Sequence, residues 1–226
     1  MSVSEQLEAV KEQIRAACFK SGRSEKEVTI IAVTKYVSIE RAREAVEAGI
    51  EDFGENRLEG ALEKYEALGN QVNWHFIGSL QSRKVKELLH AYRIIHSLDR
   101  KSLAKEIQKR SEEGQTTDCF IQLNVSGEES KAGIAADELA GFLDMLKAYP
   151  AVRVIGLMTM APYTDDPEEV RPYFRKLREL RDETAAKHLP HAPCTELSMG
   201  MSNDYHIAVE EGATYIRLGS SLVGSE

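Results

Sequence analysis

Residues 29–35 read Thr-Ile-Ile-Ala-Val-Thr-Lys, a run of apolar residues that ends on a single amine. The run does not alternate between polar and apolar positions, which is typical of a parallel strand whose two faces are both covered. It predicts a buried strand with Lys35 at its carboxyl end. Such a lysine has two interpretations: the strand simply leaves the core there, or the amine is partly desolvated and condenses with aldehydes.

Helical and strand patterns alternate along the chain on both sides of this run. Residues 4–20 carry a helical apolar stripe capped by Ser4, and a second helix is expected to begin at Ser38. Further strands are expected near residues 50, 72, 93, 118, 153, 195 and 213. Eight β/α units in 226 residues, preceded by one extra helix, predict a (β/α)8 barrel. A doubly wound open sheet is the alternative, but Lys35-Tyr36-Val37 is not its Gly-rich first turn.

Composition limits the classes of function. No linker or change of composition divides residues 1–226, so a single domain with one sizeable core is expected. A net charge of −8 argues against a nucleic-acid partner, which needs a basic face. Cys18, Cys119 and Cys194 lie far apart without metal-ligand spacing, so neither disulfides nor a metal site are expected. The N-terminus lacks a signal-peptide pattern and no apolar stretch approaches about 20 residues, which favours the cytoplasm and no membrane contact.

Small and polar residues collect where the expected strands end. In a barrel of this class the chemistry lies at the carboxyl ends of the strands, because the loops there form the open face. Lys35 follows the first strand and Asn56 the second. His75 lies on the third strand and Gly78-Ser79 follows it. The other candidate segments are Met158-Thr159-Met160, Ser198-Met199-Gly200-Met201-Ser202 and Arg217-Leu218-Gly219-Ser220-Ser221.

The last two segments suggest an anion site. Glycine lets a backbone approach a ligand, and consecutive N–H groups at a helix start bind phosphate, most often after the seventh and eighth strands of such a barrel. Serine and glycine are also ordinary turn residues. Arg217 lies inside a strand, where an unpaired charge is costly. It is therefore expected to point into the barrel mouth towards an acceptor, either a carboxylate or a ring nitrogen.

Six ordered motifs over essentially the whole chain resemble those of the pyridoxal phosphate homeostasis proteins, single-domain relatives of the barrel domain of bacterial alanine racemases. They are Ala32-Val33-Thr34-Lys35, Phe53-Gly54-Glu55-Asn56-Arg57, Trp74-His75-Phe76-Ile77-Gly78-Ser79-Leu80-Gln81, Gly156-Leu157-Met158-Thr159-Met160, Leu197-Ser198-Met199-Gly200-Met201-Ser202-Asn203-Asp204 and Ile216-Arg217-Leu218-Gly219-Ser220.

The resemblance implies a set of contacts to pyridoxal 5'-phosphate. Lys35 is expected to hold this cofactor as a reversible Schiff base, and Arg217 to face the pyridine nitrogen. The resemblance further implies that the phosphate is bound by Ser198 with the neighbouring backbone, and by Gly219 and Ser220. Asn56 and Met158 are expected close to the ring, and Met201 completes the cofactor-binding set.

The same resemblance bears on catalysis. Arginine can donate a hydrogen bond to a ring nitrogen but supplies no proton, which leaves the ring a poor electron sink. The racemases share this feature and use two acid/base groups, one of them from a second domain for which this chain is expected to have no room. Five other candidate bases are more often packing or hydrogen-bonded residues: Tyr36, Tyr163, Tyr205, His75 and His206.

The expectation is therefore a monomeric carrier rather than an enzyme. It would hold pyridoxal phosphate, keep the free aldehyde low and pass the cofactor to apoenzymes. Two alternatives stay open: a pyridoxal phosphate-dependent racemase or aldolase-like lyase, and a metal-free sugar-phosphate aldolase whose lysine attacks the substrate directly.

Overall fold

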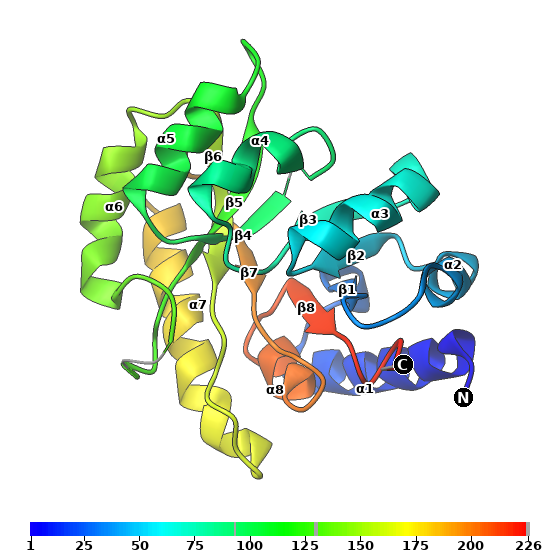
Figure 1. Cartoon of the computed structure of the whole chain (residues 1–226). Helices are drawn as coiled ribbons and strands as arrows, with labels where there is room; N and C mark the ends of the chain where they lie inside the picture. Colours follow the sequence, from blue (N-terminus) through cyan, green and yellow to red (C-terminus); the bar gives the residue numbers. More distant parts are fainter. Residues whose placement is uncertain (93, 129–130, 225–226) are drawn as a thin grey trace.

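The computed structural model of the chain describes residues 1–92, 94–128 and 131–224. Within these residues eight strands form a closed barrel in which each strand runs parallel to the next and β8 pairs with β1 (Figure 1). The predicted (β/α)8 barrel is confirmed. The strands are β1 (Thr29–Val33), β2 (Asp52–Glu55), β3 (Asn73–Phe76), β4 (Ile94–Leu98), β5 (Thr117–Gln122), β6 (Val152–Met158), β7 (Glu196–Ser198) and β8 (Tyr215–Leu218).

Two strand limits differ from the sequence prediction in ways that matter for the site. β1 ends at Val33, whose partner on β2 is Gly54, so Lys35 lies in the loop beyond the strand. β2 begins at Asp52 rather than at residue 50, because its pairing with β1 starts there. The expected start of the fourth strand at Arg93 lies outside the described residues.

The helices surround the barrel and are α1 (Val3–Ser21), α2 (Ile39–Glu47), α3 (Leu58–Leu68), α4 (Val85–Leu88), α5 (Lys101–Arg110), α6 (Leu139–Leu146), α7 (Arg171–Ala185) and α8 (Tyr205–Glu210). The predicted cap of the first helix at Ser4 is wrong. Ser2 is the cap, because its hydroxyl accepts from the Glu5 N–H while the Glu5 carboxylate accepts from the Ser2 N–H. Ser38 caps α2 as predicted. None of the helices in the described ranges is both long and apolar enough to traverse a bilayer.

Helix α1 belongs to the outer layer, where it lies beside α8 (Figure 1). The Tyr205 hydroxyl on α8 donates to Gln13 Oε1 on α1 at 2.7 Å. On the other side Arg41 of α2 donates to Gln6 Oε1 at 3.2 Å. The extra helix therefore covers the outside of the barrel where β8 meets β1. Its buried residues are Val3, Leu7, Val10, Ile14, Ala17 and Cys18.

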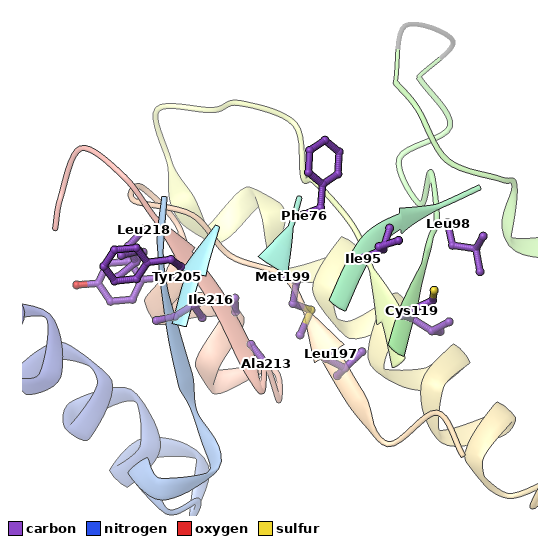
Figure 2. Close-up of a cluster of buried hydrophobic side chains, with 14 of the residues drawn as sticks. Phe76, Ile95, Leu98, Cys119, Leu197, Met199, Tyr205, Ala213, Ile216 and Leu218 are labelled. Atoms are coloured by element: carbon purple, nitrogen blue, oxygen red, sulfur yellow. The ribbon is translucent and has the colours of Figure 1, made fainter. Parts of the chain in front are cut away.

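The main apolar core lies between the strands and the helices. Figure 2 shows part of it, built from Ile95, Cys119, Leu197, Ile216 and their neighbours. Successive residues of a strand point to opposite faces, so the residue next in sequence to each of these points into the barrel. Those inward residues are His96, Phe120, Ser198 and Arg217, and they touch one another or a shared neighbour. The inside of this barrel is therefore polar and aromatic, not filled mainly with branched aliphatic side chains.

Candidate cofactor site

A pocket of about 620 Å³ opens at the carboxyl ends of the strands. This is the face and the size expected for a cofactor site in such a barrel. Of the residues predicted from sequence, six line the pocket: Lys35, Asn56, Met201, Arg217, Gly219 and Ser220. Met158 and Ser198 do not line it; both are buried.

Lys35 is exposed at the pocket, so of the two interpretations of the sequence the structure does not show the partly desolvated amine. Its Nζ lies 4.6 Å from the centre of the Tyr36 ring, a cation–π contact. The preceding residue, Thr34, is fully buried and firmly held. Its carbonyl accepts from Lys64 Nζ at 2.7 Å, and its hydroxyl donates to Glu55 Oε1 at 2.5 Å. These bonds fix the backbone from which Lys35 projects.

Lys64 and Glu55 form a buried ion pair with Nζ and Oε1 3.0 Å apart. Sequence reasoning missed this support for Lys35. A glutamate at the end of a predicted strand and a lysine in the middle of the next predicted helix read as solvent-facing residues. No local pattern marks them as buried.

Arg217 is buried at the inner end of the pocket. One Nη donates to Ser198 Oγ at 2.6 Å and the other to the Thr159 carbonyl at 2.9 Å. Burial lowers the pKa of Arg217 to about 10, against the charge of Asp204, which raises it, so the guanidinium stays protonated at neutral pH. Its partners are thus a hydroxyl and a carbonyl, not the carboxylate that one reading of the sequence anticipated.

The position of Ser198 differs from the one predicted for a phosphate ligand. Its hydroxyl lies beneath Arg217 and also bonds His96 Nδ1 at 2.8 Å. Met158 pairs with Ser198 across β6 and β7 and is buried at the same level. Ser202 is the serine of the same segment that lines the pocket. The sequence did not distinguish the two serines because both lie in one Ser-Met-Gly-Met-Ser run.

Two helical turns open onto the pocket from the loops after β7 and β8. The Met201 carbonyl accepts from the N–H groups of Asp204 and Tyr205, and the Gly219 carbonyl accepts from those of Leu222 and Val223. The N–H groups at the start of such turns have no backbone partner, and within the described ranges none is found for Ser202, Asn203 or Ser220. The Ser221 hydroxyl joins the turns by donating to Ser202 Oγ at 3.0 Å. This arrangement suits an anion.

Asn56 contributes an unpaired acceptor to the pocket wall. Its Oδ1 is buried and, among the described residues, has no hydrogen-bond partner. The backbone of Gly78 lies so close to the backbone of Asn56 that a Cβ on Gly78 would be 2.2 Å from the main-chain carbonyl oxygen of Asn56. Because buried polar atoms are nearly always satisfied, the orphaned oxygen indicates that a ligand completes this wall.

The mouth of the pocket is apolar. Six large apolar side chains are exposed in the described part of the chain, and four of them line this pocket: Tyr36, Met160, Tyr163 and Met201. Of the tyrosines expected to be packing residues, Tyr163 is 81% exposed and Tyr36 is 56% exposed, with its ring under Lys35 Nζ. Tyr205, by contrast, is buried and bonded to Gln13.

Comparison with known proteins agrees with the geometry. Residues 6–226 match the family model of the alanine racemase N-terminal domain. The pyridoxal phosphate homeostasis protein of Aquifex aeolicus is 47% identical, with 99% of this chain and 98% of that protein covered. The protein of the same name from Pseudomonas aeruginosa is 35% identical, with 99% and 96% covered.

Solved structures agree as well. PipY of Synechococcus elongatus PCC7942, with PLP bound, superposes with a TM-score of 0.84 at 32% identity, covering 98% of this chain and all of that chain. The alanine racemase of Corynebacterium glutamicum shares the barrel fold, with a TM-score of 0.68 at 16% identity over 60% of its own length. The chain therefore belongs to the alanine racemase N-terminal domain family and, within it, to the pyridoxal phosphate homeostasis proteins.

Proposed function

We propose that the protein binds pyridoxal 5'-phosphate in this pocket, holds it as a reversible Schiff base on Lys35 and acts in cytoplasmic pyridoxal phosphate homeostasis. The observation that carries the proposal is one pocket with an exposed amine, a buried guanidinium and two turns of open amides. The relatives named as homeostasis proteins and the PLP-bound PipY support it.

The residues present fit the chemical groups of this cofactor. The cofactor supplies an aldehyde, which a lysine amine captures with loss of one water molecule. Ser202, Ser220 and the N–H groups of their turns suit the phosphate. Arg217 has N–H groups left to donate to the ring nitrogen, and Asn56 offers its unpaired amide. Ser198 and Met158 drop out of the proposed contact set because they lie behind the pocket wall.

A carrier role follows from two properties of the site. A guanidinium at the ring nitrogen donates a hydrogen bond without supplying a proton, which limits carbanion chemistry. The rim formed by Tyr36, Met160, Tyr163 and Met201 leaves Lys35 exposed, so the ligand can exchange. We propose storage of the cofactor, control of the free aldehyde and delivery to apoenzymes by a monomer of this chain.

A second candidate, an amino-acid racemase or aldolase-like enzyme, is favoured by one observation. The phenols of Tyr36 and Tyr163 both line the pocket and could exchange protons with a substrate. Incubation of the loaded protein with L- and D-amino acids, followed by chiral chromatography, separates the two functions. Turnover that disappears in Lys35→Ala would establish the enzyme and overturn the carrier.

Borohydride reduction is the decisive test of cofactor binding. The loaded protein is expected to absorb visible light, to be bleached by borohydride and to yield a pyridoxyl group on Lys35 in a peptide map. Lys35→Ala should show no adduct. Lys131→Ala is the matched control, because Lys131 Nζ reaches the Met160 carbonyl at the rim yet has no proposed covalent role. An adduct on Lys131 in place of Lys35 would overturn the assignment.

Cofactor transfer tests the delivery part separately. Loaded protein is mixed with an apoenzyme, and recovery of enzyme activity is compared with that from the same concentration of free cofactor. Transfer no faster than dissociation into solution removes delivery and leaves storage.

A further inference from the structure

Five polar side chains form an unbroken chain of hydrogen bonds through the inside of the barrel. Asp52 Oδ1 lies 2.9 Å from His75 Nε2, and His75 Nδ1 lies 2.9 Å from His96 Nε2. His96 Nδ1 lies 2.8 Å from Ser198 Oγ, which accepts from Arg217 at 2.6 Å. The five residues come from β2, β3, β4, β7 and β8. The chain runs from the amino end of β2 to the cofactor pocket, and the proposed function assigns no role to its first three members.

We call these five residues the relay. Its middle members are closed to solvent, while one end, Asp52, is near the surface and the other, Arg217, lines the pocket. His75, His96 and Ser198 are fully buried, whereas the Asp52 side chain is 17% exposed. Two rings enclose the histidines: Phe120 stacks on His96 at 4.3 Å, and Tyr215 lies against both His75 and His96. Burying this many polar groups is costly unless each is paired.

The chemistry of the groups fixes the direction of every hydrogen bond. A guanidinium can only donate, so Ser198 Oγ accepts from Arg217, and a carboxylate can only accept, so Asp52 accepts from His75 Nε2. With one proton on each ring, His75 Nδ1 and His96 Nδ1 are then acceptors, and Ser198 gives its own hydrogen to His96 Nδ1. His96 then carries its proton on Nε2 and donates it to His75 Nδ1. His75 in turn carries its proton on Nε2 and donates to Asp52. Burial, and after it the neighbouring His75 ring and the Arg217 guanidinium, hold the pKa of His96 well below its ordinary value, in keeping with a neutral ring.

We propose that Asp52, His75 and His96 are positioning residues for Arg217, which hold its guanidinium on Ser198 and balance its charge through a one-directional relay. Ser198 and Thr159 occupy two of the five N–H groups of Arg217, and the rest are left for the pocket. Because a guanidinium can only donate, a group held in this place at the inner end of the pocket accepts only a ligand atom with a free lone pair. This last step rests on the proposed function, in which that atom is the ring nitrogen.

Asp204 is the acidic group whose charge acts directly on Arg217. It lines the pocket, and its Oδ1 accepts from the Met201 N–H at 2.6 Å. The relay therefore supplies a second, distant negative charge, and Asp52 can be changed without touching the pocket. A substitution of Asp52 therefore tests the relay without changing a residue of the pocket.

The first experiment uses the cofactor-free protein with ¹⁵N-labelled histidine. Two-bond ¹H–¹⁵N spectra at neutral pH are expected to show His75 and His96 as neutral rings protonated on Nε2. A ring of His96 protonated on Nδ1, or a charged ring at either position, overturns the relay. Because no cofactor is present, this result does not depend on the proposed function.

The second experiment compares Asp52→Asn with Glu196→Gln. Asparagine can keep the hydrogen bond to His75 through its carbonyl but removes the charge. Glu196, at the same end of the barrel, is bonded to Thr195 and is not in the relay. Asp52→Asn is expected to shift the His75 and His96 resonances. It should also weaken pyridoxal phosphate binding about tenfold, as for outer partners of a ligand group, and change the absorption band of the bound cofactor.

Glu196→Gln should leave the resonances, the absorption band and the Kd unchanged, and Asp52→Glu should restore part of the loss. Unfolding of each variant in urea separates a loss of stability from a loss of positioning, because a purely structural role does not move the absorption band. Unchanged binding and absorption in Asp52→Asn overturn the positioning role. Absence of binding in the wild type instead overturns the proposed function, while the tautomers still decide the relay.

Discussion

At the scale of single residues, three serines with similar sequence surroundings have different environments. Ser202 and Ser220 line the pocket at the start of two turns, whereas Ser198 lies beneath Arg217. The difference arises because Ser198 is the last residue of β7 and points into the barrel, while Ser202 follows in the loop. Neighbouring serines of one motif therefore lie on different sides of the pocket wall.

Ser202→Ala and Ser220→Ala are expected to weaken cofactor binding by about 1.5–3 kcal/mol each, the value of a hydrogen bond to a charged group. The absorption band of the bound cofactor should stay the same, since neither serine contacts the ring. Fluorescence titration measures the Kd. Ser198→Ala is the contrasting variant, expected to change the absorption band because it releases Arg217. Full cofactor retention in both Ser202→Ala and Ser220→Ala would contradict the phosphate assignment.

The buried pair behind Lys35 gives a second prediction at this scale. Lys64→Met leaves the Glu55 carboxylate buried without its cation, so the free energy of unfolding should fall by about 3–5 kcal/mol. Combining it with Glu55→Gln removes the unpaired charge and should recover most of the loss. Urea unfolding of the single and double variants is the measurement. A single variant as stable as the parent would show that Thr34 and solvent suffice to hold Glu55.

At the scale of elements, the pairing of β6 with β7 depends on a close approach of the two strand backbones. β6 meets β7 at Gly156, opposite Glu196, and a Cβ on Gly156 would lie 2.2 Å from the Glu196 carbonyl oxygen. This contact positions β7, whose last residue is Ser198 and whose loop forms one turn of the anion site. Gly156 therefore helps to position the pocket loop that follows β7, although it does not line the pocket itself.

Gly156→Ala is expected to lower the free energy of unfolding by about 1–3 kcal/mol, because the added methyl group forces β6 and β7 apart. Gly141→Ala on α6 is the matched control. Nothing lies within 4 Å of its Cβ position, so alanine should stabilise the helix by about 0.5–1 kcal/mol. Thermal or urea unfolding compares the two. A Gly156→Ala variant as stable as the parent would show that β6 and β7 can move apart at little cost in free energy.

At the scale of the whole molecule, an ion-pair cluster joins the last two helices, α7 and α8. Glu211 at the end of α8 lies 3.2 Å from Arg171, 3.1 Å from Arg175 and 2.9 Å from Arg178, all on α7. Burial raises the pKa of Glu211, but the arginines outweigh it and the net shift is downwards. A carboxylate with a lowered pKa stabilises the fold above its ordinary pKa, and this contribution is lost as the pH falls.

The free energy of unfolding should therefore decline as the pH falls below about 4.5, the ordinary pKa of glutamate. Glu211→Gln should be less stable than the parent at neutral pH and should show a shallower decline with acid. Urea unfolding over a series of pH values measures both slopes. Equal slopes for the parent and Glu211→Gln would show that other carboxylates dominate the acid response.

Much of this molecule could be predicted from local patterns. The alternation of apolar runs and helical stripes predicted the barrel, and the polar residues after the strands predicted the face that carries the pocket. Six of the eight predicted site residues line that pocket. Ser198 and Met158 lie behind the pocket wall, because each is the last residue of its strand and is buried inside the barrel, which the sequence pattern did not show.

The sequence by itself determined the order of the elements, the amine of Lys35 and the motifs of the family, because each depends on residues close together along the chain. Only the tertiary structure decided that Asp52, His75 and His96 meet Ser198 and Arg217, and that Lys64 and Glu55 are buried behind Lys35. Those meetings depend on the register and closure of the barrel, which bring residues from distant strands to one point and which no local pattern encodes.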